Sequence, residues 1–329
     1  MNVECYIDTY HIGPQKIGRP AKCDLFFIKT HAMLFITIWD KRVICKFLQT
    51  AYANRKQRTK SRKKEWNPMS ILNKIIECEI EYLKCFCKSN EQPDFIRFQD
   101  NLMPDMYYHN YTWVKSINND NALLKLIESE ITYSKSAGKN SCLIRCHIPI
   151  SNSILTQLAR LTHKPKVSVS GYYVFDVSNL PNLNKVKDCS VVKVENDEMV
   201  EDILMLDLQH DEEELGRDFC TRRVYRRKDI YLSDEGVDSY ICYYNNEAVG
   251  NCDLFIHNGA AKIEDFAVSP QSQRKGYGTT ILKSLIETAL KRNADIVYLE
   301  TDEGDTAKEM YRKCGLFKIN DFTDLLFNF

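Results

Sequence analysis

The sequence carries no net charge, no long apolar run and no C-x-x-C pair of cysteines. Its 329 residues hold 45 Lys and Arg against 45 Asp and Glu, which removes any whole-chain argument for nucleic acid or an anionic membrane. The longest apolar stretch, residues 26–39, contains Lys29 and His31 and is too short to span a bilayer. The start of the chain also lacks the charged-then-apolar order of a secretory signal. We therefore expect a cytoplasmic protein with no membrane partner.

The thirteen cysteines include no C-x-x-C pair. Cys85 and Cys87 are two positions apart, Cys142 and Cys146 are four apart, and the other spacings are irregular. A zinc site would require closely spaced Cys or His pairs in loops. We expect no metal, and we expect the cysteines to be buried free thiols in a reducing compartment.

The length of the chain favours two domains, and the first 68 residues differ from the rest. An apolar region at 25–48 is followed by a dense basic run at 54–64. Such runs are usually solvated linkers, although they can hold nucleic acid by displacing counterions from phosphates. Nucleic acid is the less favoured partner. A third option is that the natural chain starts at Met69 and that residues 1–68 are an over-extended reading frame.

From Met69 onward, helix-period and strand-period patterns alternate, which predicts an α/β (α+β) fold with a mixed central sheet flanked by helices. Within residues 69–180, we expect a helix at 71–86, strands at 95–98 and 107–114, a helix at 122–136, a strand at 142–150, a helix at 151–161 and a strand at 167–177. The polar segment around Pro181 is interpreted as a linker.

Residues 188–329 contain a second series of elements with a similar rhythm. The expected elements are a strand at 190–194, helices at 197–208 and 211–226, strands at 238–244, 247–256 and 261–268, a helix at 278–292, a strand at 296–301, a helix at 306–314 and one or two strands at 317–329. Asn245 and Asn246 indicate a hairpin between the second and third of these strands.

The most informative stretch is the loop Gln273-Arg274-Lys275-Gly276-Tyr277-Gly278, which lies between a strand and an amphipathic helix. Its glycines let backbone amides approach a ligand, and the helix start adds free N–H groups and a positive dipole end. This combination predicts a phosphate site, to which Arg274 and Lys275 add positive charge. A dinucleotide loop would need a third glycine where Ile281 stands, and a G-x-x-x-x-G-K-[ST] loop is missing there.

The Q-x-x-G-x-G pattern between strand and helix resembles the pyrophosphate-binding motif of the GNAT acetyltransferase superfamily. The resemblance continues in order through the strand Tyr298-Leu299-Glu300-Thr301 and a helix that carries Tyr311 shortly before Gly315 and Phe317. It covers residues 188–329. Where many members have an asparagine seven residues before the tyrosine, this chain has Gly304, which puts the usual asparagine contact to the cofactor arm in doubt.

The resemblance implies an enzyme, an acetyl-CoA-dependent N-acetyltransferase that acts on a primary amine of a small molecule or peptide by direct attack in a ternary complex. Acetyl-CoA would be the co-substrate, and the amide of Val268 would polarise its thioester carbonyl. The residues that the resemblance assigns to acetyl-CoA are Phe266, Ala267, Val268, Gln273, Arg274, Lys275, Gly276, Tyr277, Gly278 and Thr279. A non-catalytic acyl-CoA-binding module is the alternative.

Two proton transfers need side chains. Tyr311 resembles the family's general acid, which protonates the departing CoA. An amine acceptor must also lose a proton, and a nearby carboxylate would take it. Glu264 and Asp265 are neighbours on a strand and should point to opposite faces. We favour Glu264 as the base, with Asp265 and Asp302 as alternatives.

Residues 69–180 echo the second half and resemble the inactive partner of tandem members of the family. The segment 115–121, at the place of the loop, has no glycine and little positive charge, so it cannot cradle a pyrophosphate. We therefore expect a degenerate copy. His210 and His257 have no evident partner and are assigned to structure or surface. The oligomeric state and the acceptor are left open, with a homodimer as one option.

Overall fold

The computed structural model describes residues 7–9, 26–28, 67–233 and 236–329. In the first compact unit, β1 (Ile7–Thr9) pairs antiparallel with β2 (Phe26–Ile28). The basic run at 54–64 and most of the apolar region at 25–48 lie outside the described residues. The second unit, Asn67–Phe329, contains all the other elements.

An eleven-stranded mixed sheet runs through the second unit. Its strand order is β3 (Lys88–Glu91), β4 (Phe95–Gln99), β5 (Tyr111–Val114), β6 (Ser141–Cys146), β13 (Leu316–Asn328), β7 (Lys166–Phe175), β12 (Ile296–Asp302), β11 (Ala260–Val268), β10 (Glu247–His257), β9 (Asp238–Tyr244) and β8 (Cys189–Lys193). The pairs β5–β6 and β11–β12 are parallel, and the other neighbours are antiparallel. The predicted mixed sheet flanked by helices is confirmed.

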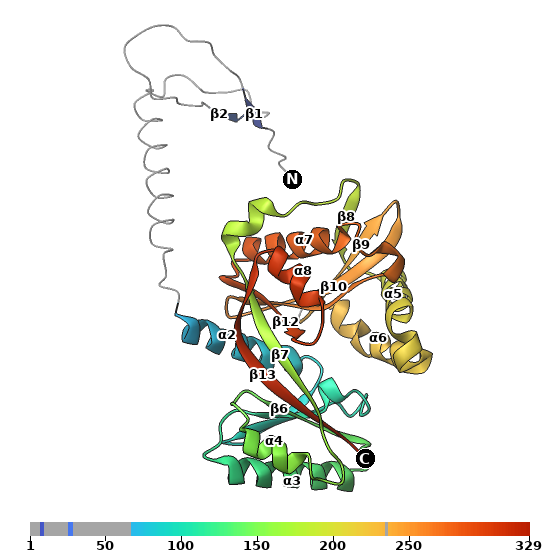
Figure 1. The fold of residues 1–329 in the computed structure, drawn as a ribbon. Helices are drawn as coiled ribbons and strands as arrows, with labels where there is room; N and C mark the ends of the chain where they lie inside the picture. The colour runs from blue at the N-terminus through green and yellow to red at the C-terminus, as the bar shows by residue number, and fades with distance from the viewer. Residues whose placement is uncertain (1–6, 10–25, 29–66, 234–235) are drawn as a thin grey trace, which may run out of the picture. The chain divides into compact units, whose positions relative to one another are not determined.

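The two halves of this sheet are built in the same order. In the first half, β3, β4 and β5 are followed by α3 (Asp120–Ser136), β6, α4 (Asn152–Leu158) and β7. In the second half, β9, β10 and β11 are followed by α7 (Tyr277–Lys291), β12, α8 (Ala307–Lys313) and β13. The last strands are exchanged: β7 pairs with β12, β13 pairs with β6, and the two pair with each other. Figure 1 shows β7 and β13 as the long pair that joins the halves.

Helices cover both faces of the second half. On one face α2 (Pro68–Lys84), α5 (Asp197–Leu215) and α6 (Arg217–Tyr231) share a core that includes Ile75, Ile203 and Tyr298. On the other face α7 and α8 build a second core, in which Ile281 and Leu285 are fully buried. The apolar stripe of α7 recurs every three to four residues, so one face of the helix lies on the sheet. No helix within the described ranges is long and apolar enough to cross a bilayer.

Several boundaries differ from the sequence prediction for local reasons. The expected break between residues 208 and 211 is wrong, because α5 continues to Leu215 and the chain turns at Gly216, whose φ is 81°. The strand expected at 107–114 begins only at Tyr111, after a short 3-10 turn, η1 (Tyr107–His109). Strand β3 was not predicted, since its residues are all polar and exposed.

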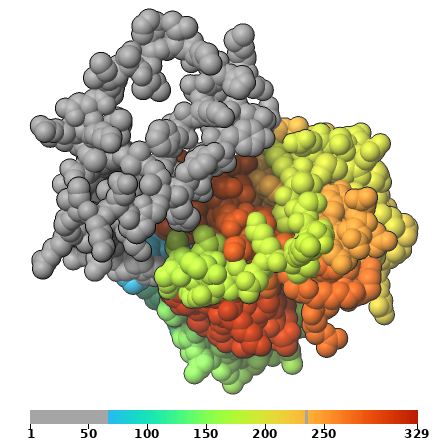
Figure 2. Space-filling model, turned by 90° about the horizontal axis from the view of Figure 1, so that it is seen from above, coloured from blue at the N-terminus to red at the C-terminus, as the bar shows by residue number. Residues whose placement is uncertain are grey.

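The segment that joins the halves packs against α7. It begins with η2 (Val177–Asn182), and the Val186 amide then donates to Thr280 Oγ1 at 2.8 Å. Lys283 Nζ of α7 donates to the carbonyl of Leu183 at 2.6 Å. Figure 2 shows this yellow-green segment lying against the orange and red C-terminal elements. The expected linker is therefore fastened to the helix that follows the glycine loop.

Candidate active site

The site lies where two parallel strands separate. Strands β11 and β12 pair over only four residues each, where residues 260–263 lie opposite residues 296–299. Beyond that point β12 stays with β7 as far as Asp302, whereas β11 stays with β10 as far as Val268. The strands diverge between these two neighbours, and a cleft of about 870 Å³ opens between them.

A β-bulge shapes β11 at the cleft. Two residues of β11 lie opposite a single residue, Cys252, of β10, and Asp265 in the bulge has a φ of 48°. The side-chain amide of Asn251 donates to the Asp265 carbonyl at 3.3 Å. A Cβ at Gly250 would lie 2.5 Å from the Ala267 carbonyl oxygen, so only glycine lets β10 approach the bulge this closely. Bulges of this kind re-aim groups beside active sites.

The bulged strand turns a backbone amide toward the cleft. The Ser269 amide donates to the Val249 carbonyl on β10 at 3.0 Å. Successive N–H groups of a strand point to opposite sides. The Val268 amide therefore points away from β10, to the side where β12 has diverged. An oxyanion placed there would accept a hydrogen bond from it.

The glycine loop places the start of α7 at the same cleft. Gly276 is the N-cap of α7, with a φ of 90°, and no described side chain caps this helix. The amides of Tyr277, Gly278 and Thr279, in the first turn, lack partners within the helix. Arg274 has a φ of 61° and lines the cleft with Gly278. Free amides, the helix dipole and a guanidinium together suit an anion such as a pyrophosphate.

Most of the residues expected at the site face the cleft. Those that line it are Glu264, Phe266, Ala267, Val268, Gln273, Arg274, Gly276, Gly278, Thr279 and Tyr311. Lys275 and Tyr277 do not line the cleft. The Tyr277 ring is buried and packs against Tyr244, with 5.3 Å between the ring centroids. His210 of α5 lines the cleft although it was assigned to structure or surface. An isolated histidine in a charged helix gives no sequence signal of such a position.

Tyr311 brings a hydroxyl to the cleft from α8. Its side chain is 7% exposed, and its ring lies edge-on to Phe266 with centroids 6.1 Å apart. The hydroxyl forms no hydrogen bond with another described residue. Burial raises the pKa of Tyr311, with smaller contributions from Cys252 and Glu264. The phenol is therefore protonated at neutral pH and able to donate.

The carboxylates of β11 are both bound to buried cations. Glu264 Oε2 lies 2.9 Å from Lys262 Nζ, and Asp265 is ion-paired with Arg227. Both cations lie against aromatic rings at the end of α2, so the expectation of opposite faces is wrong. The bulge and the positive φ of Asp265 break the alternation of the strand. Asp302, also at the cleft, forms no ion pair with a described residue.

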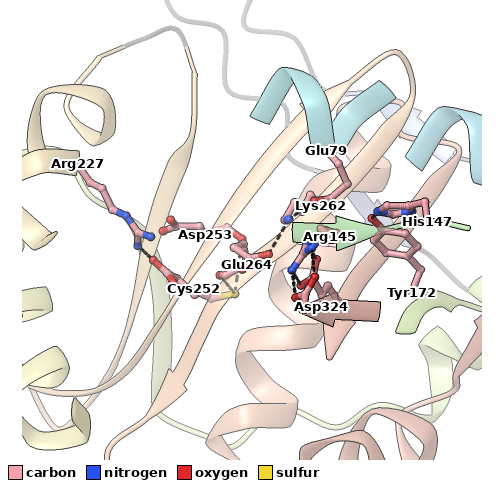
Figure 3. Close-up of polar contacts among 12 residues, drawn as sticks. Glu79, Arg145, His147, Tyr172, Arg227, Cys252, Asp253, Lys262, Glu264 and Asp324 are labelled. Carbon is pink, nitrogen blue, oxygen red and sulfur yellow. Dashed lines mark hydrogen bonds and ion pairs between the residues drawn. The ribbon is translucent and has the colours of Figure 1, made fainter. Parts of the chain in front are cut away.

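A buried arginine from the first half reaches the back of the cleft. Arg145 of β6 binds Glu300 through two hydrogen bonds of 3.0 and 2.9 Å, and Asp324 through two of 2.9 Å. Glu300 lines the cleft, and Figure 3 shows the contacts of Arg145 with Asp324 to one side of Glu264. Although burial opposes it, the two carboxylates raise the pKa of Arg145. Nothing in the sequence pairs these positions, which lie more than 150 residues apart.

The cysteines form no disulfides within the described parts of the chain. Cys252 is fully buried under the bulge, and its Sγ lies 3.3 Å from the Glu264 carbonyl oxygen. Burial raises the pKa of this thiol well above its ordinary value. The residues that the structure describes contain no group of three or more His, Cys, Asp or Glu placed to hold a metal ion.

Comparisons with known proteins find similarity over the part of the chain that carries this site. Residues 199–316 match the model of the acetyltransferase (GNAT) family. An uncharacterized N-acetyltransferase, CgeE, of Bacillus subtilis is 29% identical over 104 residues, 30% of this chain and 40% of that protein. Streptothricin acetyltransferase A of the same organism is 34% identical over 74 residues, 22% of this chain and 43% of that protein. The chain thus spans about two fifths of the length of these relatives.

Solved structures extend the likeness of fold to most of the chain. A functionally unknown conserved protein from Staphylococcus epidermidis has a TM-score of 0.64 at 20% identity, covering 77% of this chain and 99% of its own. A GCN5-related N-acetyltransferase from Kribbella flavida has a TM-score of 0.56 at 11% identity, covering 77% and 94%. The C-terminal part of this chain, over residues 199–316, is thus similar to the acetyltransferase (GNAT) family.

Proposed function

We propose that the chain is an N-acetyltransferase that moves the acetyl group of acetyl-CoA to a primary amine by direct attack in a ternary complex. One observation carries the proposal: three groups of different function open onto the same cleft between β11 and β12. The uncapped start of α7 offers amides for the pyrophosphate. Val268 and Tyr311 line the same cleft, where the Val268 amide would bind the thioester carbonyl and the Tyr311 hydroxyl would protonate the leaving sulfur.

The reaction needs a neutral amine and a protonated leaving group. A lysine-like amine has a pKa near 10.4, so making it neutral at pH 7 costs roughly 4 to 5 kcal/mol. Glu264 takes this proton, directly or through water. The amine nitrogen then attacks the thioester carbon, and the Val268 amide binds the resulting oxyanion. The carbonyl re-forms and the C–S bond breaks as Tyr311 gives its proton to the CoA sulfur. The acceptor nitrogen still carries one extra proton, which passes directly or through water to the Tyr311 phenolate, and Glu264 releases its proton to solvent.

The charge of the cleft favours a cationic acceptor. The carboxylates that line it are Glu264, Asp265, Glu300, Asp302 and Asp305. Among the described residues of the lining, the only lysine or arginine is Arg274, in the loop. A cavity of about 130 Å³ adjoins the cleft and adds Asp207 and Asp211, both bound by Arg223. Three of the five carboxylates of the cleft have cationic partners among the described residues, so Asp302 and Asp305 supply the unpaired negative charge, which favours an ammonium group over an acidic acceptor.

The first half is proposed to be a degenerate copy, residues 69–180, beside the catalytic domain at 188–329. Both halves place a helix after their third strand, but the two helix starts differ. The side chain of Asn119 caps α3 by accepting from the Ala122 amide at 3.0 Å. The corresponding start of α7 has Gly276 and no capping side chain. The Asn119 side chain uses one of the free amides of α3 and lies where a phosphate would have to approach, so acetyl-CoA would bind in the second half alone.

Calorimetric binding of acetyl-CoA and CoA to the full chain and to a Gly276→Glu, Gly278→Glu double variant tests the cofactor site. We expect micromolar binding that the variant loses, because two carboxylates would then occupy the phosphate site. Thiol release with amines of increasing positive charge then tests the transfer. A well-folded wild type that binds no acetyl-CoA contradicts the proposal. Binding without turnover on any amine would instead support a non-catalytic acyl-CoA-binding module.

A further inference from the structure

Lys262 bridges two carboxylates, one from helix α2 and one from its own strand, β11. Its Nζ lies 2.6 Å from Glu79 Oε2 and 2.9 Å from Glu264 Oε2. Glu79 belongs to α2, 183 positions before Lys262 in the sequence. The Lys262 and Glu79 side chains are 4% and 2% exposed, whereas Glu264 is 32% exposed. Figure 3 shows the three in a row, with Lys262 between the other two.

This arrangement is not explained by stability. Taking two charges out of water costs several kcal/mol per ion, and apolar replacements of similar volume are often neutral or stabilising. Glu79 Oε1 is, in addition, buried without a hydrogen-bond partner. Of the three side chains, only Glu264 lines the cleft. The buried pair therefore acts on the cleft through Glu264.

We propose that Lys262 and Glu79 are positioning residues for Glu264, an inference that rests on the proposed acetyl transfer. Lys262 holds Oε2 of Glu264 and leaves Oε1 for the acceptor ammonium. In the proton transfer, an N–H bond of the ammonium breaks and an O–H bond forms at Oε1. Lys262 keeps its protons throughout, and Glu79 contacts neither substrate nor cofactor.

Glu79 is needed because an unshared ammonium would make Glu264 a poor base. An opposite charge within about 4 to 6 Å favours the charged form of a carboxylate. Glu79 shares the Lys262 ammonium and offsets part of this effect, while Tyr82 presents a neutral ring 4.6 Å from Lys262 Nζ. Tyr311 faces Glu264 from α8 as a neutral phenol. Lys262 thus supplies orientation, and Glu79 preserves basicity.

The other charged groups around the cluster are held by partners of their own. From β12, Glu300 is bound by Arg145, and from α6, Arg227 is bound by Asp265. From β10, Asp253 accepts a hydrogen bond from a buried tyrosine hydroxyl at 2.8 Å. These pairings leave Lys262 as the cation that contacts Glu264 among the described residues.

The test is the pH profile of kcat and of kcat/KM in Glu79→Gln and Lys262→Met. Glu79→Gln should move the acidic limb to lower pH by about one unit, and Lys262→Met should move it to higher pH by about as much. Each should lower kcat about tenfold at neutral pH, with acetyl-CoA affinity unchanged. Glu77→Gln removes the same charge from the exposed side of the same helix and should change neither limb nor rate. Opposite shifts are not expected of residues that merely stabilise the fold.

Folded variants with acidic limbs at the wild-type position would overturn the positioning role. If a single variant fails to fold, the Glu79→Leu, Lys262→Met double variant carries the test, because it removes both charges together. Its acidic limb should stay near that of the wild type while kcat falls, and an unchanged kcat would overturn the proposal. A wild type that binds acetyl-CoA but acetylates no amine overturns the proposed function itself, before any variant is compared.

Discussion

Replacing Tyr311 by phenylalanine tests the chemical step with little disturbance of the fold. The ring is 7% exposed and packs edge-on against Phe266, contacts that phenylalanine retains. The hydroxyl forms no hydrogen bond with another described residue. Its removal breaks no protein hydrogen bond, so we expect the free energy of unfolding to change by less than about 1 kcal/mol.

The expected loss of rate is much larger than the change in stability. A positioned general acid contributes about 10² to 10⁴ in rate, which corresponds to roughly 3 to 5 kcal/mol of barrier. The acid acts only as the thiolate leaves, so kcat should fall by at least about a hundredfold while acetyl-CoA affinity persists. Burial raises the pKa of Tyr311, so the donor stays protonated as pH rises and should produce no alkaline limb below about pH 10.

Single-turnover thiol release measures this step without interference from product release. Tyr298→Phe is the matched control, because Tyr298 is fully buried on β12 and belongs to the core on the other face of the sheet. It should keep the wild-type rate. A Tyr311→Phe rate within about threefold of wild type, at equal acetyl-CoA affinity, would refute Tyr311 as the acid.

Four further predictions concern the loop and the buried charges. Gly276→Ala should lower the free energy of unfolding in urea by about 1 to 2 kcal/mol, because φ is 90° and the new Cβ would lie 3.0 Å from a valine methyl. Gly278→Ala, whose Cβ meets only ordinary contacts of 3.5 to 3.7 Å, should instead keep that stability and weaken acetyl-CoA binding about tenfold in calorimetry. Arg145→Met should destabilise by about 3 to 5 kcal/mol in the same urea titration, since it leaves two carboxylates without their cation. Burial raises the pKa of Asp253 from 3.8 to about 6. The folded state therefore binds this proton more tightly than the unfolded state, and the free energy of unfolding should fall as pH rises between these values. Asp253→Asn should flatten this slope in denaturant titrations from pH 4 to 7.

Local sequence signals predicted the parts of the molecule that depend on local chemistry. The apolar stripe of α7 and the glycines before it were enough to place an uncapped helix start after a strand. The order of elements in both halves followed from alternating periodicities. Four residues of the loop, the strand at 266–268 and Tyr311 line the same cleft, and their roles toward acetyl-CoA stay predictions.

Long-range pairing could not be predicted in the same way. A polar strand such as β3 has no apolar alternation to reveal it, and the exchange of β7 and β13 leaves no trace in either strand alone. Regular strand alternation predicted that Glu264 and Asp265 point to opposite faces, but the bulge at Asp265 interrupts that alternation. Lys262, which pairs with Glu264, is also bound by Glu79 of α2. Glu300 is bound by Arg145 of β6. Only the folded sheet brings these residues together.

These long-range contacts give the first half a defined relation to the cleft. The outer neighbour of β12 is β7, so the strand that holds one side of the cleft is itself held by the first half. Glu79 and Arg145, also from the first half, bind the cations and carboxylates behind the cleft. The second half taken alone would expose the backbone edge of β12 and leave Glu300 without its arginine. A half that has no glycine loop can thus still determine how the other half presents its carboxylates to an amine.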